Sequence, residues 1–211
     1  PTHCYDANKI NNKLILHEIE SEVEFETLLD RKISLKGKNP VFSLNSEVIN
    51  LAGVVGGKST SCTTNTKTVI VECAFFQPEA IIGKSIKYDI QSDASHKFER
   101  GVDPECQDRV LRRFIKLVSA HTNIIDMSVV HYKFKDTKTV KIPVNVDKIN
   151  QIIGTNINES QYLSDLSKLG FVEDDGLIVV PSYRSDIKNQ NDLAEEIARV
   201  IGYNNIPKNP L

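Results

Sequence analysis

The chain has 211 residues, of which 40% are hydrophobic and 26% are charged, and its net charge is −2 at pH 7. This size and apolar content are sufficient for packed cores, and we expect two domains. The sequence has no run of 18 apolar residues and no basic segment followed by an apolar stretch, so we expect no membrane span, no secretory signal and a cytoplasmic location. The near-neutral charge excludes a global basic field for nucleic acid, so any RNA contact must be local or shared with a partner.

The cysteines and the first residue add two expectations. Four cysteines at positions 4, 62, 73 and 106 have spacings that fit neither a zinc site nor a redox pair. We therefore expect reduced thiols, as in other cytoplasmic proteins. The sequence starts at Pro1 without an initiator methionine, so we also expect a piece of a longer polypeptide.

The first part of the chain is predicted to be rich in β structure. Short apolar runs separated by turn residues predict strands over residues 13–19, 21–28, 37–44, 47–57 and 68–76. A short helix is expected over residues 77–86, with Pro78 near its first turn. An amphipathic helix is expected over residues 102–121, with Asp103 as its cap and Pro104 at its first position. A strand over residues 124–134 and a polar linker over residues 135–139 follow.

The pattern changes after the linker. We expect a strand over residues 140–144, helices over 146–153, 159–169 and 191–201 that end at glycines, and a hairpin over 170–181 with Asp175-Gly176 as its turn. The predicted fold class is α+β: a β-rich domain with packed helices over residues 1–136, then a small winged-helix-like domain with a β-hairpin over residues 137–211. The second of its helices offers only Lys168 as a basic residue, which favours protein contact over DNA binding.

One charged residue interrupts an apolar run. Glu72 lies in the segment "TVIVECAFF", residues 68–76, where an unpaired buried carboxylate would cost several kcal/mol or take up a proton. The residue type alone favours a Glu at a strand edge that pairs with Lys67 or Arg100. A binding role for the carboxylate is the alternative.

Four carboxylates gather near the last predicted helix. Asp192, Glu195 and Glu196 stand at positions i, i+3 and i+4 and so share one helical face, and Asp186 comes just before the helix. Such a set can offer oxygen ligands to a hard divalent ion, which suits Mg²⁺ better than zinc. The simpler interpretation is that the acidic residues complement the helix dipole and that Glu195 pairs with Arg199.

Five blocks of sequence together resemble a known family. The blocks "PTHCYDANKI", "LAGVVGG", "TVIVECAFF", "SDASHKFERGVDP" and "VPSYRSDIKNQNDLAEEIARVIGYNNIP" occur in the order and at the separations found in the β subunit of bacterial-type phenylalanyl-tRNA synthetase. The resemblance implies that residues 1–136 are the editing module, formed by the third and fourth domains, and that residues 137–211 are the fifth domain. It also implies an α2β2 enzyme whose α subunit binds ATP and phenylalanine, while the β subunit hydrolyses Tyr-tRNA-Phe. ATP would be used by the whole enzyme and not bound here.

The resemblance implies roles for particular residues. Glu72 would accept the hydroxyl of a misplaced tyrosine, and His3 would orient the ester or hold the attacking water. Gly53, Gly56 and Gly57 would let backbone N–H groups approach an ester oxygen. Ser92 and Ala94 would line the pocket, the alanine leaving room for the ring. For each of these positions a purely structural role is the alternative. No side-chain nucleophile is evident, so attack by water is expected.

The resemblance also implies ligands and partners. Asp186, Asp192, Glu195 and Glu196 would bind Mg²⁺ in a site shared with the α subunit. The expected partners are the α subunit and tRNA-Phe, with no DNA and no membrane. A rival hypothesis holds that the chain is a scaffold without catalytic activity that binds the α subunit and tRNA.

Overall fold

The fold is described from a computed structural model that covers residues 1–11, 13–133 and 136–207. The chain divides into two compact units. The first unit comprises Pro1–Val102 and Cys106–Asp126, and the second comprises Asp103–Glu105 and Met127–Leu211. Apart from the short segment Asp103–Glu105, the boundary between the two units therefore lies after Asp126. Of the linker predicted over residues 135–139, residue 135 lies outside the described residues.

The first unit is built from antiparallel sheets. Strands β2 (Ile15–Ile19), β5 (Asn39–Leu44), β6 (Glu47–Leu51) and β7 (Val55–Gly56) form one sheet in the order β2-β5-β6-β7. Strands β3 (Val23–Glu26) and β4 (Lys32–Leu35) form a hairpin, and β1 (His3–Asp6) pairs with β8 (Val69–Glu72). The five runs predicted over residues 13–76 match six of these strands, because the run over residues 47–57 contains both β6 and β7, but β1 and β4 were missed.

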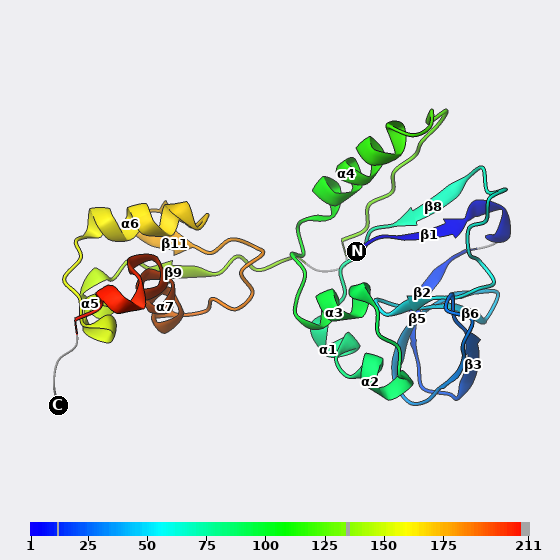
Figure 1. The fold of residues 1–211 in the computed structure, drawn as a ribbon, viewed down its shortest axis with the longest axis horizontal. Helices are drawn as coiled ribbons and strands as arrows, with labels where there is room; N and C mark the ends of the chain where they lie inside the picture. Colours follow the sequence, from blue (N-terminus) through cyan, green and yellow to red (C-terminus); the bar gives the residue numbers. More distant parts are fainter. Residues whose placement is uncertain (12, 134–135, 208–211) are drawn as a thin grey trace. The chain divides into compact units, whose positions relative to one another are not determined.

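Helices cover one side of the first unit (Figure 1). They are α1 (Pro78–Ile81), α2 (Lys84–Tyr88) and α3 (Asp93–Glu99), and α4 (Gln107–Ser119) follows. The prediction of a single helix over residues 77–86 is wrong, because Gly83 adopts a left-handed φ of 79° and separates α1 from α2. Helix α3 was not predicted. Helix α4 begins at Gln107, three residues beyond the predicted first position, because Asp103 instead closes a turn by accepting from the N–H of Glu105.

The strand predicted over residues 124–134 is not present in its described part, residues 124–133. The apolar side chains there are exposed, and Ile125 is 99% exposed. A strand requires a neighbouring backbone with which to form a ladder. None of the described strands pairs with these residues, so their alternating pattern is left without a sheet. Residue 134 lies outside the described residues.

The second unit closely follows its predicted elements. It consists of β9 (Lys141–Pro143), α5 (Val146–Ile153), α6 (Glu159–Lys168), β10 (Val172–Asp174), β11 (Leu177–Val179) and α7 (Gln190–Ile201), with a sheet of order β10-β11-β9. Asn145, Asn158 and Asn189 cap the three helices. Asp175 and Gly176 both have positive φ, as the predicted tight hairpin turn requires. The α+β fold class is confirmed.

Each unit has its own core. Buried side chains of the first unit include Tyr5, Phe42, Leu51, Phe76 and Phe98, and those of the second include Ile149, Tyr162, Leu166, Leu193 and Ile197. None of the described helices combines the length and the apolar character needed to cross a membrane.

Candidate functional site

The pairing of β1 with β8 brings two predicted site residues together. His3 lies directly opposite Glu72 in the antiparallel register, and Tyr5 lies opposite Ile70. Opposite residues project to the same face of a sheet, and diagonal neighbours are within reach of long side chains. Two strands that are 63 or more residues apart in sequence therefore place an imidazole, a phenol and a carboxylate on one face.

A hydrogen-bonded chain ends on Glu72. The hydroxyl of Tyr5 donates to Oε2 of Glu72 at 2.7 Å, and Nδ2 of Asn50 donates to the same hydroxyl at 2.7 Å. Burial raises the pKa of Glu72 to about 7, although the hydrogen bond from Tyr5 opposes the shift. Burial and the carboxylate likewise raise the pKa of the Tyr5 phenol. The site therefore holds a carboxyl group that changes its charge near neutral pH.

His3 lies beside this chain with one ring nitrogen unused. Its ring contacts the ring of Tyr5 edge to face, with centroids 4.5 Å apart. Nε2 is buried and has no hydrogen-bond partner among the described residues. Burial lowers the pKa of His3, which favours the neutral imidazole. A buried polar atom without a partner is costly, so it indicates a water or a ligand atom at this position.

The three glycines of "LAGVVGG" serve different purposes. A Cβ on Gly56 would lie 2.1 Å from Cε1 of His3, so the imidazole requires a glycine there. Gly53 alone of the three has a positive φ, 71°, and it packs against Phe76 and Ile81. The N–H of Gly57 already donates to the carbonyl of Ile49 at 2.8 Å. This N–H is therefore already paired within the protein, and the predicted contact of the Gly57 backbone with an ester oxygen stays a prediction.

Ser92 and Ala94 lie where α3 begins. The hydroxyl of Ser92 caps the helix by accepting from the N–H of Ser95, and it donates to the carbonyl of Val54 at 2.6 Å. Ser92 therefore links α3 to the segment that contains Gly53, Gly56 and Gly57, and the proton of its hydroxyl is already donated. Ala94 is partly buried and packs on the core of the first unit. A series of edge-to-face contacts, from Tyr5 through Phe42 and Phe76 to Phe98, links the two sides of this core.

The simplest interpretation of Glu72 is not what the structure contains. Among the described residues its one hydrogen bond comes from Tyr5, and it pairs with neither Lys67 nor Arg100. Arg100 instead contacts His96, four residues earlier on α3. Sequence reasoning missed Tyr5 and Asn50. Asn50 could have been found by the same signal that singled out Glu72, a polar group within an apolar strand pattern, whereas the segment HCYD around Tyr5 carries no such pattern.

Family models match both units of the chain. One described as the B3/4 domain matches residues 1–123, which is more than half of the chain, and one described as the tRNA synthetase B5 domain matches residues 142–203. The chain belongs to the B3/4 domain family. The predicted resemblance to phenylalanyl-tRNA synthetase β subunits is also confirmed by similar proteins. Phenylalanine–tRNA ligase β subunits of Ehrlichia canis and Protochlamydia amoebophila are 34% and 35% identical over 100% and 99% of this chain.

The match covers only part of each relative. The chain spans 28% of the Ehrlichia canis protein and 27% of the Protochlamydia amoebophila protein. A crystal structure of an N-terminal fragment of the phenylalanyl-tRNA synthetase β subunit from Pyrococcus horikoshii aligns with 96% of this chain and 60% of its own, with a TM-score of 0.47 and 14% identity.

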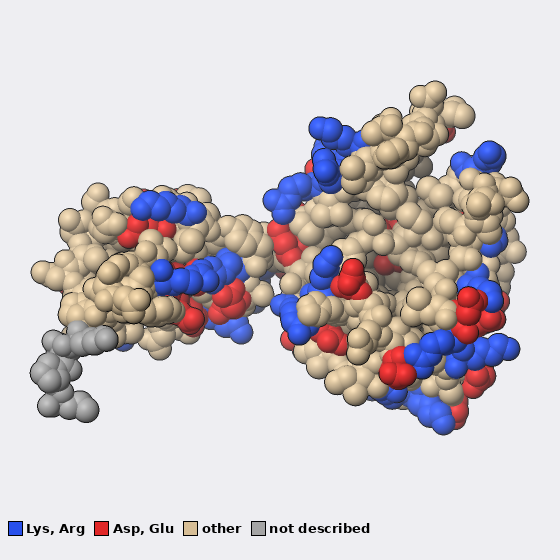
Figure 2. Space-filling view, in the orientation of Figure 1, with Lys and Arg blue, Asp and Glu red and all other residues tan. Residues whose placement is uncertain are grey.

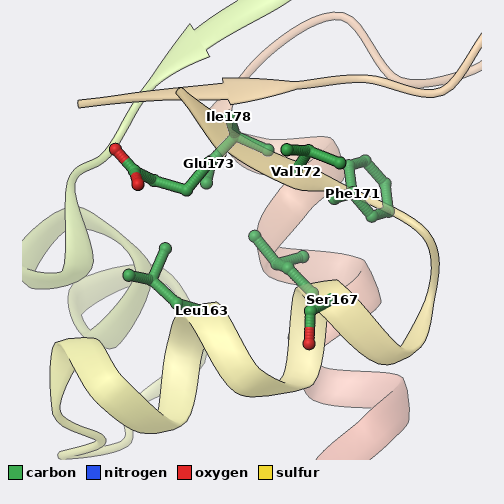
Figure 3. Close-up of a pocket in the computed structure, with 7 residues that line it drawn as sticks. Leu163, Ser167, Phe171, Val172, Glu173 and Ile178 are labelled. Atoms are coloured by element: carbon green, nitrogen blue, oxygen red, sulfur yellow. The ribbon is translucent and has the colours of Figure 1, made fainter. Parts of the chain in front are cut away.

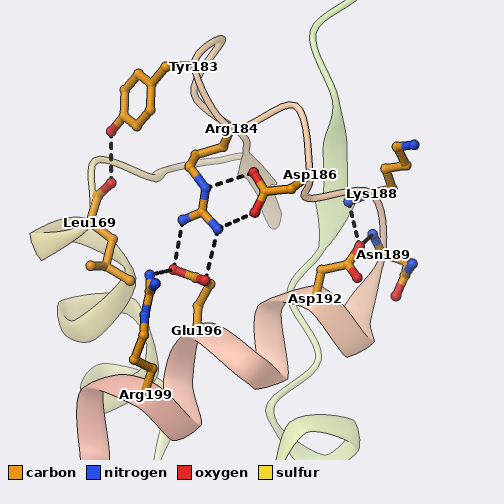
Figure 4. Close-up of polar contacts among 9 residues, drawn as sticks. All are labelled: Leu169, Tyr183, Arg184, Asp186, Lys188, Asn189, Asp192, Glu196 and Arg199. Atoms are coloured by element: carbon orange, nitrogen blue, oxygen red, sulfur yellow. Dashed lines mark hydrogen bonds and ion pairs between the residues drawn. The ribbon is translucent and has the colours of Figure 1, made fainter. Parts of the chain in front are cut away.

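In the B5 domain the acidic cluster is organised around an arginine (Figure 4). Arg184 donates to both oxygens of Glu196, at 2.7 and 2.8 Å, and to both oxygens of Asp186, at 2.9 and 2.6 Å. Arg199 also contacts Glu196. Asp192 accepts from the N–H groups of Lys188 and Asn189 and so completes a capping box on α7.

This arrangement does not fit a Mg²⁺ site formed by the B5 domain alone. The guanidinium of Arg184 takes the position between Asp186 and Glu196 that a cation would need, Asp192 is engaged in capping, and Glu195 is exposed. No group of three or more potential ligands from His, Cys, Asp and Glu forms within the described ranges. Sequence reasoning missed the role of Arg184. The site shared with an α subunit stays a prediction.

A pocket of about 300 Å³ lies between α6 and the hairpin of the B5 domain (Figure 3). Its walls are mainly apolar, with Ser167 and Glu173 as the polar members; the lining residues are Leu163, Leu166, Ser167, Phe171, Val172, Glu173 and Ile178. Lys168, the single basic residue predicted on this helix, is paired with Asp165 at 2.7 Å. None of the residues that line this pocket belongs to the Glu72 site.

Proposed function

We propose that the B3/4 domain of this chain hydrolyses tyrosine that has been wrongly attached to tRNA-Phe, as the editing part of a phenylalanyl-tRNA synthetase. The observation that carries the proposal is the partly buried carboxyl group of Glu72, which accepts a hydrogen bond from a phenol and faces an imidazole with an unused nitrogen. Phenylalanine and tyrosine differ by one hydroxyl group. A carboxylate that accepts from a phenol is the chemistry needed to tell them apart.

Selection follows from what each amino acid would leave unpaired. Oε1 of Glu72 accepts no hydrogen bond from the described residues, and a carboxylate can accept several. The hydroxyl of a bound tyrosine would supply a donor there, whereas phenylalanine would leave Oε1 desolvated without a donor, with only Oε2 paired to Tyr5. A site built to hydrogen-bond a hydroxyl can reject the analogue that lacks it by roughly 10⁴-fold or more. An apolar synthetic pocket rejects an added hydroxyl only about a hundredfold, so a second site is needed.

Hydrolysis itself requires a positioned water. The neutral imidazole of His3 can accept a proton from a water or orient it, and its unpaired Nε2 provides the position. Gly56 gives the imidazole room beside the backbone. Because the hydroxyl of Ser92 and the N–H of Gly57 are both in use, we assign them to the scaffold of the site.

Helix α4 supports a contact with tRNA. Arg109, Arg112, Arg113 and Lys116 stand at positions i, i+3, i+4 and i+7 and are all exposed, so they form one basic stripe, and Lys and Arg atoms gather along this helix in Figure 2. Such a stripe suits the phosphates of a nucleic acid backbone. In this proposal the α subunit supplies ATP binding and charging, and the B5 domain contributes to assembly.

A scaffold without catalytic activity is the alternative function. The exposed apolar side chains of residues 124–130 favour it, because such side chains are typical of contacts between proteins. The two functions differ in whether Glu72 affects ester hydrolysis.

The test compares Glu72→Gln with the wild type in the complete enzyme that contains this chain. Preformed Tyr-tRNA-Phe and Phe-tRNA-Phe are supplied, and hydrolysis of each ester is measured. We expect the wild type to clear the tyrosyl ester preferentially and Glu72→Gln to lose most of that preference. Glu26→Gln, on an exposed residue paired with Lys58, is the matched control and should behave as wild type. Equal preference in the wild type and in Glu72→Gln would reject the proposal in favour of the scaffold.

A further inference from the structure

Tyr5 occupies an unusual position for a core tyrosine. It is fully buried, and its hydroxyl uses one donor and one acceptor, toward Glu72 and from Asn50. Because the amide nitrogen of Asn50 can only donate, it commits the phenolic proton to Glu72. The direction of the whole chain, from Asn50 through Tyr5 to Glu72, is therefore set by a residue on β6 that does not touch the carboxylate.

We propose that Tyr5 is a positioning residue that holds Oε2 of Glu72 and thereby reserves Oε1 for the hydroxyl of the tyrosyl substrate. The inference rests on the proposed function and goes beyond it, because it assigns selectivity to a residue that does not contact the substrate. It also explains why a phenol of the protein itself lies against the carboxylate: one oxygen is held internally, and the other is left to be satisfied from outside.

Packing alone does not account for the hydroxyl. A phenylalanine at this position would keep the edge-to-face contacts that Tyr5 makes with His3 and Phe42. The tyrosine instead requires a second buried polar residue, Asn50, to satisfy its hydroxyl. Burying polar groups is costly unless every one is paired, and an apolar core would avoid that cost. The hydrogen bonds of Asn50 and Tyr5 lead to Glu72, so we expect them to affect the hydrogen bonding and the charge of that carboxyl group.

The surroundings of Glu72 determine how the hydroxyl acts on its charge. Among the described residues, the titratable groups near it are His3 and Tyr5 on β1 and Cys73, the next residue after β8. The hydrogen bond from Tyr5 favours the ionised form of Glu72, in opposition to burial. Without that hydrogen bond the carboxyl would remain protonated to higher pH and would offer a donor in place of an acceptor. The preference for the tyrosyl ester over the phenylalanyl ester should therefore depend on pH. The hydrogen bond from Tyr5 should lower the pH at which this preference is half of its maximum.

The experiment measures kcat/KM for hydrolysis of Tyr-tRNA-Phe and Phe-tRNA-Phe between pH 6 and 9 in the complete enzyme. The ratio of the two values removes the common effect of pH on ester hydrolysis. We expect Tyr5→Phe to lower the ratio by about tenfold or more at pH 7.5, the size expected for one hydrogen bond to a charged group, and to move its midpoint to higher pH. Asn50→Asp keeps the ring of Tyr5 but competes for the phenolic proton, and it should lower the ratio too.

Two comparisons make the outcome decisive. Tyr88→Phe removes another buried hydroxyl of the first unit, one that donates to Asn39 at 2.8 Å. This variant therefore measures the general effect on the enzyme of losing a buried hydroxyl, and it should leave the ratio of the two kcat/KM values unchanged. In a Glu72→Gln background, Tyr5→Phe should have no further effect on the ratio. A ratio and midpoint unchanged by Tyr5→Phe, in an enzyme that loses its preference with Glu72→Gln, would overturn the role of Tyr5 alone. A wild type without preference for the tyrosyl ester would remove the proposed function, and the role of Tyr5 with it.

Discussion

Arg184 and Glu196 form a two-pronged ion pair in the B5 domain, with N–O distances of 2.7 and 2.8 Å. The side chain of Glu196 is 4% exposed and that of Arg184 is 17% exposed. The same guanidinium holds Asp186 and lies over the ring of Phe171. It therefore joins the loop before α7 to the helix itself.

Removal of Arg184 should loosen α7. Arg184→Ala leaves the buried carboxylate of Glu196 with only the more exposed Arg199, and breaking a buried pair in this way typically costs about 3 kcal/mol or more. Hydrogen exchange of the α7 amides in the complete subunit measures the effect. Arg112→Ala, which breaks an exposed pair with Asp108, is the control and should leave the protection of the α7 amides unchanged. Equal protection of the α7 amides in Arg184→Ala and in the wild type would contradict the role of Arg184 in stabilising α7.

Mg²⁺ should not change the stability of the isolated β subunit through this cluster. The guanidinium of Arg184 already pairs with both Asp186 and Glu196, Arg199 supplies a second positive charge at Glu196, and hydrogen bonds from Arg184 lower the pKa of both carboxyls. Addition of Mg²⁺, or its removal by a chelator, is therefore expected to leave hydrogen exchange of α7 unaltered. Tight binding of one Mg²⁺ that is lost in Asp192→Ala would instead support the magnesium site on this chain. The same titration with the α subunit present tests the shared site.

The pH dependence of stability should carry opposite signs in the two units. The folded first unit raises the pKa of Glu72 from 4.5 to about 7, so its contribution to the free energy of unfolding is present below pH 4.5 and lost as pH rises to about 7. The loss is at most about 3 kcal/mol. In the second unit the pKa values of Asp186 and Glu196 are lowered, so their contribution is lost as pH falls through those values.

Glu72→Gln isolates the first of these effects. The amide cannot ionise, so the variant should gain stability relative to wild type as pH rises from 4.5 to 7. Denaturant unfolding of the complete subunit at several pH values, followed by a probe in the first unit, measures the difference. Glu79→Gln, on an exposed residue of α1, provides the control. A difference between Glu72→Gln and wild type that stays constant with pH would show that Glu72 does not titrate in this range.

A methyl group at position 56 should displace the imidazole of His3. The Cβ of Gly56→Ala would lie 2.1 Å from Cε1 and 2.6 Å from Nε2 of that ring, so the ring must move. We expect loss of stability and, on the proposed function, slower hydrolysis of Tyr-tRNA-Phe. The double variant His3→Ala with Gly56→Ala should recover the stability but not the hydrolysis. Wild-type hydrolysis in Gly56→Ala would argue against a role for His3.

The local elements of the second unit could largely be predicted from the sequence. Helices α5, α6 and α7 begin at asparagine caps, and the Asp175-Gly176 turn sets its hairpin, because caps and turns depend on residues close together in the chain. The break at Gly83 and the late start of α4 were missed because several local conformations were compatible with those residues. The apolar pattern at residues 124–133 was misleading because a strand depends on a partner that no local pattern specifies.

The sequence by itself determined the fold class, most elements of the second unit and the presence of a carboxylate, Glu72, where an apolar residue would be cheaper. Only the tertiary structure decided which groups surround each charged side chain. The register of β1 with β8 placed His3 and Tyr5 around Glu72, and the chain before α7 brought Arg184 into the acidic cluster. The physical reason is that the energy of a buried charge depends on atoms within a few ångströms, and those atoms come from residues distant in the sequence.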